Sequence, residues 1–556
     1  MVEALNQAET ISGHNIIGYD IPALELLTGK TITSNVIDTL ILAKLAYYDK
    51  NASWGFSLDD FGQRLGYPKG HHSDWSKYTP EMEEYCKRDV QVTRQLLTHL
   101  KRKTPWLPQE ALELEQEVQR IITQQYINGW KFDIVKAKEL HIELVGEQEK
   151  AENILRATFK PMFIPKGPVK QPKKSFTRLG ITTCGEHQPI EYTRFNPSSG
   201  NHIIWWVEKL YGKQKWKYPT EAEMRKKKRK TRGPTTFASI SLGLPDNPKT
   251  DSDTLIEMFE DKDWASPLVH YLNVNKILGQ LAEGEKAWLK QVHSDGRLHG
   301  GADPLGAVTG RFTHSTPNLA QVPSVRAFKG KESRSLFTVE RGYKLVGCDA
   351  SGLELRTLSH YLARYDGGEY GRTVLEGDIH TANQEAAGLP TRDNAKTFIY
   401  AFLYGAGDGK IGTIVDGSAK EGKILKTKFL AKTKGLKQLT EDVKKAATRG
   451  YLRGLTGRRL YVRSPHSALN TLLQSAGAYV MKYFVVELDK VLIEHAIDYK
   501  FVGNIHDEVQ IEVKEEQAEK AARLCEETFA KVTEILNFRI LLEGEAKIGN
   551  NWADTH

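Results

Sequence analysis

The sequence predicts an α+β protein made of several domains. Its 556 residues exceed the usual length of a single domain. Residues 344–348 form a short apolar run typical of a buried strand, and residues 501–513 alternate as in a β-hairpin. Residues 109–159 and 392–406 instead follow helical patterns. Strands and helices are therefore both expected, in separate parts of the chain.

The composition favours a soluble globular protein with an acidic partner. Hydrophobic residues make up 40% and charged residues 27% of the chain, which is usual for globular proteins. The net charge of +8 and the pI near 8.9 favour nucleic acid as that partner. The four cysteines lie far apart without metal-ligand spacing, which indicates reduced thiols in a cytoplasmic compartment. No apolar run is long enough to span a membrane and no secretory leader is recognisable, so no membrane partner is expected.

Two fragments near the N-terminus contain acidic residues that could take part in chemistry. The first ends in Asp20, and the second places Tyr85 and Asp89 one turn apart on a predicted helix. Each motif is weak alone. In this order they resemble the second and third motifs of DnaQ-like 3′–5′ exonucleases, which have a ribonuclease H-like fold. That family holds two metal ions with several carboxylates and orients the attacking water with a tyrosine.

The first motif of that exonuclease family is Asp-x-Glu on an opening strand. Residues 1–10 read MVEALNQAET and contain no such motif. Asp20 and Asp89 alone are not expected to hold a catalytic metal pair. We therefore interpret residues 1–105 as a truncated, vestigial exonuclease domain. Its first strands would be lost, removed, or supplied by another polypeptide.

Pro105 and Pro108 mark the next boundary, after which a long helical pattern begins. Residues 160–194 resemble a loop rich in proline and lysine, and residues 220–235 contain the basic run Arg225–Lys230. We expect both basic segments to be mobile loops that contact DNA phosphates without sequence preference.

The stretch from Arg392 to Ala406 predicts an amphipathic helix. Arg392, Lys396, Tyr400 and Tyr404 recur every four residues and therefore share one face. Two cations one turn apart repel each other mildly, which is reasonable if an anion lies against them. A polyphosphate beside the cations, with a planar base beside the tyrosines, would fit this face. An ordinary surface helix with a basic side is the alternative.

Acidic residues end the predicted strand and occupy the predicted hairpin turn. Asp349 follows the apolar run, and His506, Asp507 and Glu508 stand at the turn. An aspartate after a strand often only caps the next helix, and a polar turn needs no function. Two consecutive acids at a hairpin tip repel each other, so a nearby cation would explain them.

Together these stretches resemble motifs A, B and C of family A DNA polymerases, the family of bacterial DNA polymerase I. Five spaced segments carry the resemblance: DASGLELR (349–356), GDIH (377–380), RDNAKTFIY (392–400), RSPH (463–466) and HDE (506–508). The resemblance extends from about Gln109 to the C-terminus. It is closest to the replicative polymerases of short-tailed phages, the T-seven type.

The resemblance implies a right-hand fold with a partial exonuclease domain at residues 1–105. A mostly helical thumb would span residues 106–299. The palm, built on an antiparallel sheet, would combine residues 300–375 and 450–556, with helical fingers at 376–449 between them. The fingers helix would swing toward the palm when the correct nucleotide binds.

The resemblance also implies how the chemistry is done. Asp349 and Asp507 would hold two Mg²⁺ ions, with the carbonyl of Ala350 as a further ligand and Mn²⁺ as an alternative ion. Lys396 would protonate the leaving pyrophosphate. Glu508 would have an auxiliary role.

Other residues would bind the substrates. Arg392, Lys396 and His380 would hold the triphosphate, and Tyr400 would pack near the sugar and base. Glu354 would collide with a ribonucleotide 2′-hydroxyl and so select deoxyribose. The residues expected to contact DNA near the new base pair are Arg311, Asn470, Gln474, His506 and Tyr404.

The expected function is template-directed DNA synthesis, in which dNTPs are added to a primer 3′ end, as in phage replication. The expected partners are primer-template DNA, dNTPs, and a helicase-primase or a polypeptide that completes the exonuclease. A phage-encoded chain would act in the cytoplasm of a bacterial host. The segment before Phe195 is shorter than the insertion with which the T-seven type binds thioredoxin, which argues against thioredoxin binding. Proofreading by this chain alone is not expected.

Three other functions share parts of this pattern. A single-subunit RNA polymerase shares the palm and a Lys/Tyr helix, but Glu354 argues against it. A pure nuclease would need the exonuclease carboxylates that residues 1–10 lack. A catalytically silent DNA-binding protein would have no need of Asp349, Asp507 and Lys396 together.

Overall fold

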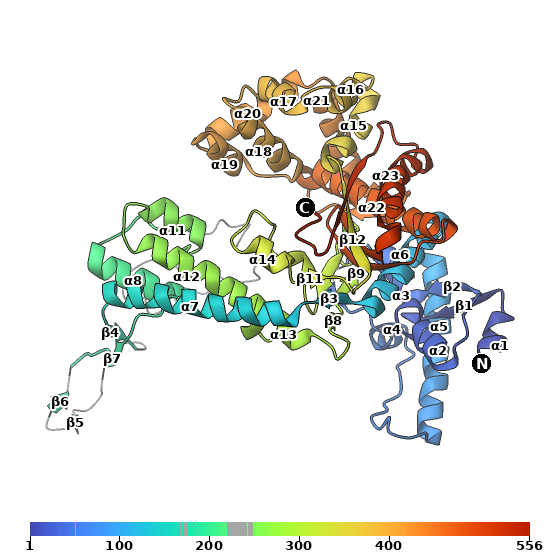
Figure 1. The fold of residues 1–556 in the computed structure, drawn as a ribbon, viewed down its shortest axis with the longest axis horizontal. Helices are drawn as coiled ribbons and strands as arrows, with labels where there is room; N and C mark the ends of the chain where they lie inside the picture. The colour runs from blue at the N-terminus through green and yellow to red at the C-terminus, as the bar shows by residue number, and fades with distance from the viewer. Residues whose placement is uncertain are drawn as a thin grey trace. The chain divides into compact units, whose positions relative to one another are not determined.

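A computed structural model describes residues 1–50, 52–166, 169–171, 176–178, 181–183, 185–218, 242 and 248–556. The chain divides into two units, one formed by Met1–Phe132 with Val292–His556 and the other by Asp133–Gln291. Helices predominate in both, and small sheets complete an α+β protein of several parts (Figure 1). No helix among the described residues is long and apolar enough to cross a lipid bilayer.

The N-terminal part of the first unit is a small parallel sheet with helices packed around it. β1 (Thr10–Gly13) and β2 (Asn35–Asp38) pair in parallel. The other elements are α1 (Val2–Asn6), η1 (Ile16–Asp20), α2 (Ile21–Thr28), α3 (Thr39–Ala46), η2 (Ala52–Trp54), α4 (Leu58–Arg64) and α5 (Pro80–Lys103). The N–H of Asp38 donates to the side chain of Gln116 on α6 (Gln109–Asn128) at 2.8 Å. This bond fastens the small sheet to the rest of the unit.

The central sheet of the first unit has four antiparallel strands in the order β15-β16-β12-β17. They are β12 (Tyr343–Ala350), β15 (Tyr499–Ile505), β16 (Glu508–Lys514) and β17 (Gly544–Gly549). The helices α22 (Ala468–Glu494), α23 (Ala518–Ile535) and α6 pack against this sheet (Figure 1). Alternate residues such as Val346, Val509 and Ile511 are buried in the core beneath it. The apolar run and the alternating pattern in the sequence are therefore two neighbouring strands of one sheet.

A helical lobe follows β12 in the sequence and has a core of its own. Its helices are α15 (Leu353–Asp366), α16 (Glu369–Glu376), α17 (Ile379–Ala387), α18 (Arg392–Leu403), α19 (Asp408–Gly412), α20 (Ala419–Lys432) and α21 (Leu436–Ala447) (Figure 1). Phe398, Leu403 and Phe429 are buried between them. α18 ends before the predicted Ala406, because Gly405 takes a positive φ of 73° that terminates the helix.

Short elements connect these parts of the first unit. They are β3 (Trp130–Phe132), β8 (Arg297–Leu298), β9 (Gly301–Asp303), β10 (Thr313–Ser315), η4 (Leu319–Gln321), α14 (Gly330–Arg334), β11 (Phe337–Thr338), η5 (Thr413–Val415), β13 (Tyr451–Arg453), β14 (Arg459–Tyr461), η6 (Pro465–Ser467) and η7 (Glu515–Gln517). β13 and β14 form a hairpin between the helical lobe and α22.

The second unit is mainly helical. Its helices are α7 (Ile134–Thr158), α8 (Gly200–Tyr211), α11 (Ser252–Phe259), α12 (Ala265–Leu278), η3 (Gly279–Glu283) and α13 (Trp288–Gln291). Large aromatic side chains, among them Phe159, Trp206 and Trp264, fill its core.

Residues 160–194 are not the loop that the sequence predicted. β4 (Met162–Pro165) pairs antiparallel with β7 (Ile190–Thr193), and β5 (Phe176–Arg178) pairs with β6 (Ile181–Thr183). Proline was misleading here because it is tolerated at a strand end, where Pro165 stands. The pairing partners are distant in sequence, so local composition does not reveal them. The other predicted basic loop, at residues 220–235, lies outside the described residues.

Candidate active site

Two aspartates meet at one end of the central sheet. Asp349 lies near the end of β12, and Asp507 lies in the turn between β15 and β16. The turn is tight because His506 takes a positive φ of 59°. The N–H of Ala350 donates to the carbonyl of Asp507 at 3.0 Å. The backbone therefore holds the two acidic residues beside each other.

Burial and neighbouring carboxylates raise the pKa of both aspartates at this end of the sheet. Asp349 reaches solvent, yet loss of surrounding water raises its pKa to about 7, and the charges of Asp507 and Glu508 add to the rise. The pKa of Asp507 is also raised, first by burial and then by Glu354. A divalent cation would offset this repulsion, and carboxylate and carbonyl oxygens are the ligands that Mg²⁺ prefers. The donor set therefore fits a hard divalent ion.

This donor set leaves part of a metal's coordination to other oxygens. Among the described residues, no group of three His, Cys, Asp or Glu side chains is arranged to hold a metal ion. Mg²⁺ commonly keeps several waters and binds substrate phosphates alongside one or two carboxylates. Two aspartates and a carbonyl are consistent with that kind of site.

Glu508 already has partners for both of its oxygens. It is buried and stands opposite Asp349 in the register of β16 and β12. Trp552 Nε1 donates to its Oε1 at 2.6 Å, and His556 Nε2 lies 2.8 Å from its Oε2. Gln510 also donates to its Oε1. These contacts favour the auxiliary role over direct metal binding.

Glu354 contacts two of the residues predicted to bind DNA. It lies in the first turn of α15, directly after β12. The hydroxyl of Tyr404 donates to its carboxylate, and Arg311 NH2 lies 3.6 Å from the same oxygen. The guanidinium of Arg311 also lies over the Tyr404 ring, 5.6 Å from its centroid. The three side chains therefore form one connected group.

Tyr400 lies one turn before Tyr404 on α18, on the same side of the helix. Burial raises the pKa of Tyr400, and the charges of Glu354, Asp507 and Asp349 raise it further. Nearby, Asn470 on α22 donates through Nδ2 to a carbonyl at the end of α18.

Gln474 lies one turn beyond Asn470, on the same face of α22. His506 is exposed at the hairpin turn, where its charge lowers the pKa of Asp507. These two residues and Arg311 thus come from three separate segments of the first unit.

The cations of α18 lie beside the start of α17. Arg392 forms a two-point ion pair with Asp378, with Nε–Oδ2 at 2.8 Å and NH2–Oδ1 at 3.2 Å. Hydrogen bonds from Arg392 hold the pKa of Asp378 well below its usual range. The pKa of His380 is lowered by burial and by the charges of Arg392 and Lys396. The three residues predicted to hold a triphosphate are therefore neighbours.

The predicted exonuclease residues have a different arrangement. Asp89 forms an ion pair with Lys69 at 2.9 Å, and the Lys69 ammonium lies over the Tyr85 ring, 5.0 Å from its centroid. Asp20 ends η1, and burial raises its pKa. Lys69 thus pairs with the Asp89 carboxylate and also contacts Tyr85.

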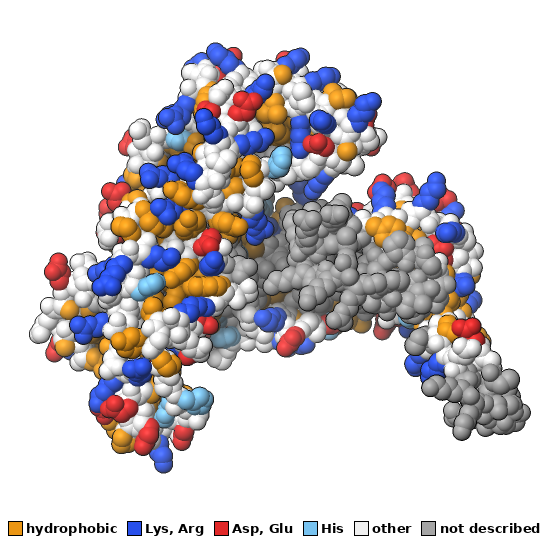
Figure 2. All heavy atoms as spheres, turned by 180° about the vertical axis from the view of Figure 1, so that it is seen from behind, with side chains coloured by type: hydrophobic (Ala, Val, Ile, Leu, Met, Phe, Trp, Pro, Cys, Tyr) orange, Lys and Arg blue, Asp and Glu red, His pale blue; other side chains and the backbone are white. Residues whose placement is uncertain are grey.

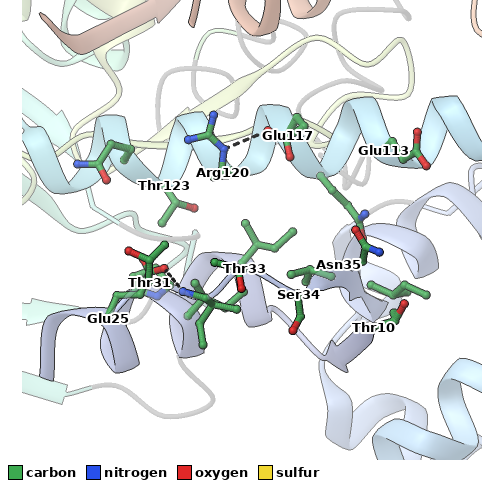
Figure 3. Close-up of a pocket in the computed structure, with 18 of the residues that line it drawn as sticks. Thr10, Glu25, Thr31, Thr33, Ser34, Asn35, Glu113, Glu117, Arg120 and Thr123 are labelled. Carbon is green, nitrogen blue, oxygen red and sulfur yellow. Dashed lines mark hydrogen bonds and ion pairs between the residues drawn. The ribbon is translucent and has the colours of Figure 1, made fainter. Parts of the chain in front are cut away.

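A cavity of about 880 Å³ lies in the N-terminal part of the first unit, and its lining includes Ile17 and Ile21 on either side of Asp20 in the sequence. Figure 3 shows it between α6, which contributes Glu117 and Arg120, and the α2–β2 segment, which contributes Glu25 and Thr33. None of the polymerase-like motifs lines it, so it is separate from the carboxylate site.

Several residues that hold the site together were not predicted. Asp378 caps α17 by accepting from two backbone N–H groups. An aspartate just before a helical pattern predicts such an N-cap, so this role could have been found in the sequence. Lys69, Trp552 and His556 carry no local signal, because their partners lie far away in the sequence.

Much of the chain is similar to known proteins. The family model for DNA polymerase family A matches residues 236–554. The DNA-directed DNA polymerases of Enterobacteria phage T3 and Escherichia phage T7 are each 34% identical to the chain, over 98% of its length and 92% of theirs.

A solved structure shows the same fold. The POL domain of Pol1 from M. smegmatis, in complex with DNA primer-template and dNTP, superposes with a TM-score of 0.73 at 20% identity. The match covers 95% of this chain and 84% of that one. The predicted resemblance to T-seven-type phage polymerases is confirmed by the phage relatives. The chain therefore belongs to DNA polymerase family A and is a DNA-directed DNA polymerase.

Proposed function

We propose that this polymerase extends primers by magnesium-dependent phosphoryl transfer at Asp349 and Asp507, in phage-type DNA replication. One observation carries the proposal: Asp349 and Asp507 are held together by the bond from the Ala350 N–H to the Asp507 carbonyl, and Tyr404 at the end of the cationic helix α18 donates to the nearby Glu354. A nucleotide held by α18 would then have its α-phosphate close to the carboxylates. Phosphoryl transfer needs this kind of positioning and charge neutralisation more than covalent chemistry.

Asp349, Asp507 and the Ala350 carbonyl would hold two Mg²⁺ ions, and Mn²⁺ would suit the same oxygens. Bound there, the ions would activate the primer 3′-hydroxyl and neutralise charge at the phosphate. The protein's own contribution is to fix both carboxylates beside one another, where a bound cation would favour their ionised forms. Glu508 would support them through its bonds to Trp552 and His556.

Arg392, Lys396 and His380 would bind the triphosphate, and Lys396 would donate a proton to the departing pyrophosphate. Arg392 first has to leave Asp378, which holds it in a two-point pair. A triphosphate carries more charge than one carboxylate, so it competes well for a guanidinium.

Glu354 would select deoxyribose by filling the space of a ribonucleotide 2′-hydroxyl. Its bonds to Tyr404 and Arg311 support this role, because they fix the carboxylate in one orientation. Arg311, Asn470, Gln474, His506 and Tyr404 would contact the DNA near the new base pair.

We assign the thumb to residues 106–299, the palm to 300–375 and 450–556, and the fingers to 376–449. Lys and Arg side chains are spread over much of the α15–α21 lobe (Figure 2). Primer-template DNA and dNTPs are the proposed substrates. The shorter segment before Phe195 argues against thioredoxin binding, whereas a helicase-primase would be a suitable partner in replication.

We propose that residues 1–105 provide no proofreading by themselves. The ion pair between Asp89 and Lys69 supports this, because a lysine neutralises the carboxylate that would otherwise bind a metal. An Asp-x-Glu strand beside these residues would be needed to form an exonuclease site.

Primer extension with aspartate variants tests the proposed chemistry. Asp349→Asn and Asp507→Asn should each lose about three or more powers of ten in rate, because each removes a metal ligand. Asp498→Asn is the matched control, since it lies at the opposite end of the same hairpin, paired with Lys514. The proposal fails if either active-site variant extends primers at the rate of the control.

A further inference from the structure

A cluster of four polar side chains is buried in the core of the first unit. Glu115 comes from α6, Arg458 precedes β14, and Tyr479 and Lys482 come from α22. Their exposed fractions are 0%, 4%, 1% and 0%, respectively. None of them belongs to the residues assigned above to metal, nucleotide or DNA.

Glu115 is the centre of this cluster. Lys482 Nζ lies 2.6 Å from its Oε2, and Arg458 NH1 lies 3.4 Å from its Oε1. The hydroxyl of Tyr479 donates to Glu115 and accepts from Arg458 NH1 at 2.5 Å. One carboxylate therefore orients two cations and a phenol that come from different elements.

This cluster is not expected to add much to the free energy of unfolding. Two cations share one buried anion, and burial lowers the pKa of Lys482 to about 8 even though Glu115 opposes the change. Buried ion pairs are often no better for stability than apolar side chains of the same volume. Their advantage is a single defined geometry, so the neighbours that the cluster fixes are informative.

The backbone of residues 308–310 rests on this cluster. Arg458 NH2 donates to the carbonyl of Val308 at 3.2 Å. Gly310 has a φ of +83°, and a Cβ added there would lie 2.9 Å from the Tyr479 ring and 3.4 Å from Arg458 NH1. The glycine allows both the conformation and the close approach.

The next residue, Arg311, reaches the active site. Its guanidinium lies 3.6 Å from Glu354 and over the ring of Tyr404. The position of this guanidinium depends on the backbone from which it projects, and that backbone is fixed by Arg458 and Tyr479. A chain of contacts thus connects Glu115 in the core to Glu354 at the site.

We propose that the Glu115–Arg458–Tyr479–Lys482 cluster positions Arg311 for its contact with the primer end. These are positioning residues, because they act through Arg311 and do not touch substrate. The inference rests on the proposed role of Arg311. A displacement of about 1 Å in a positioned group can reduce a rate about 100-fold, so a loosened backbone should be measurable.

The test is a double-mutant cycle in primer extension. Glu115→Gln keeps the shape of the side chain but removes its charge, and Tyr479→Phe removes only the hydroxyl. Each should lower kcat/KM by about 10- to 100-fold in the wild-type background. In an Arg311→Ala background, each should change kcat/KM by less than about 2-fold, because the positioned group is already gone.

Glu487→Gln is the matched control. Glu487 is buried on the same helix α22, about two turns beyond Tyr479, and it pairs with Lys490 and Lys531 instead of with the cluster. It should not alter kcat/KM in either background. Melting temperatures of all variants separate a local effect from general unfolding, and Tyr479→Phe keeps the test informative if Glu115→Gln does not fold.

The proposal is overturned if the losses in kcat/KM of the two single substitutions multiply in a double variant. The double variants are Glu115→Gln/Arg311→Ala and Tyr479→Phe/Arg311→Ala. Wild-type rates in both single variants would also overturn it. Hydrogen exchange of residues 305–312 gives an answer independent of catalysis, with faster exchange expected in Glu115→Gln and Tyr479→Phe but not in Glu487→Gln. If the wild-type chain fails to extend primers, the proposed function is wrong. In that case, hydrogen exchange of residues 305–312 that is unchanged in Glu115→Gln and Tyr479→Phe also rejects the positioning role.

Discussion

Asp349 and Asp507 oppose folding when both are charged. Their pKa values are raised above that of an aspartate in an unfolded chain, so the folded state binds protons more tightly there. Stability from these groups is therefore lost as the pH rises from about 4 to the pKa of Asp349 near 7. A site that is unfavourable without a cation and favourable with one is consistent with metal-dependent chemistry.

Tyr400 gives a prediction about sugar recognition. Its hydroxyl can supply a polar group where a dideoxynucleotide lacks the 3′-hydroxyl, and a phenylalanine cannot. We expect the wild-type polymerase to accept dideoxynucleotides almost as readily as deoxynucleotides. Tyr400→Phe should restore discrimination by about 100-fold or more, measured as the ratio of termination to extension at equal nucleotide concentrations.

Tyr404→Phe is the control for this prediction, because Tyr404 lies one turn further along and contacts Glu354 instead. It should alter ribonucleotide exclusion more than dideoxynucleotide acceptance. Strong discrimination by the wild-type enzyme would show that Tyr400 does not lie at the sugar.

At the scale of elements, α18 and the β15–β16 hairpin were predictable because their signals are local. Four-residue spacing places Arg392, Lys396 and Tyr400 on one face, and alternation of apolar residues marks the hairpin. The residues that hold the site were not predictable in the same way. Trp552 reaches Glu508, and Lys69 reaches Asp89, only after the chain has folded.

The pair between α17 and α18 gives a second prediction. Asp378→Asn keeps an acceptable N-cap for α17 but weakens the hold on Arg392. Because the pair is exposed, the effect should be small: KM for dNTP should fall by no more than about 5-fold, with kcat little changed. Steady-state kinetics at several salt concentrations would measure this, since screening should reduce the difference.

An increase in KM for Asp378→Asn would contradict this account. It would mean that Asp378 assists nucleotide binding and does not merely compete for Arg392. Asp442→Asn on α21 is a suitable control, because this exposed aspartate accepts from Tyr365 and Gln438 instead of from Arg392.

The helix α5 gives a third prediction, on proofreading. The chain alone should not degrade a 3′-mismatched primer in the absence of dNTPs, because Asp89 is paired with Lys69 and no Asp-x-Glu precedes it. The assay follows primer shortening with Mg²⁺ and with Mn²⁺. Degradation that disappears in Asp89→Ala would show that the N-terminal part is an active exonuclease.

At the scale of the whole molecule, the α+β class and the polymerase family could be predicted because several motifs occur in one order. Long-range pairing could not. Residues 160–194 look loop-like by composition, yet Phe163 and Tyr192 pack across two paired strands. The Glu115 cluster likewise joins residues from opposite ends of the polymerase region, which no local pattern indicates.

The charge of the whole molecule gives the last prediction. The chain carries a net charge of +8, and the run Arg225–Lys230 supplies six of its cations, so replacing all six with glutamine would leave +2. Each phosphate contact contributes about 0.9 to the slope of log affinity against log salt. If the run contacts DNA, the neutralised protein should have a shallower slope and unchanged sequence preference.

Neutralising six exposed lysines on α20 and α21 is the control for net charge alone. The run is not a DNA contact if both variants have the same slope, because the effect would then come from overall charge and not from its position in the chain.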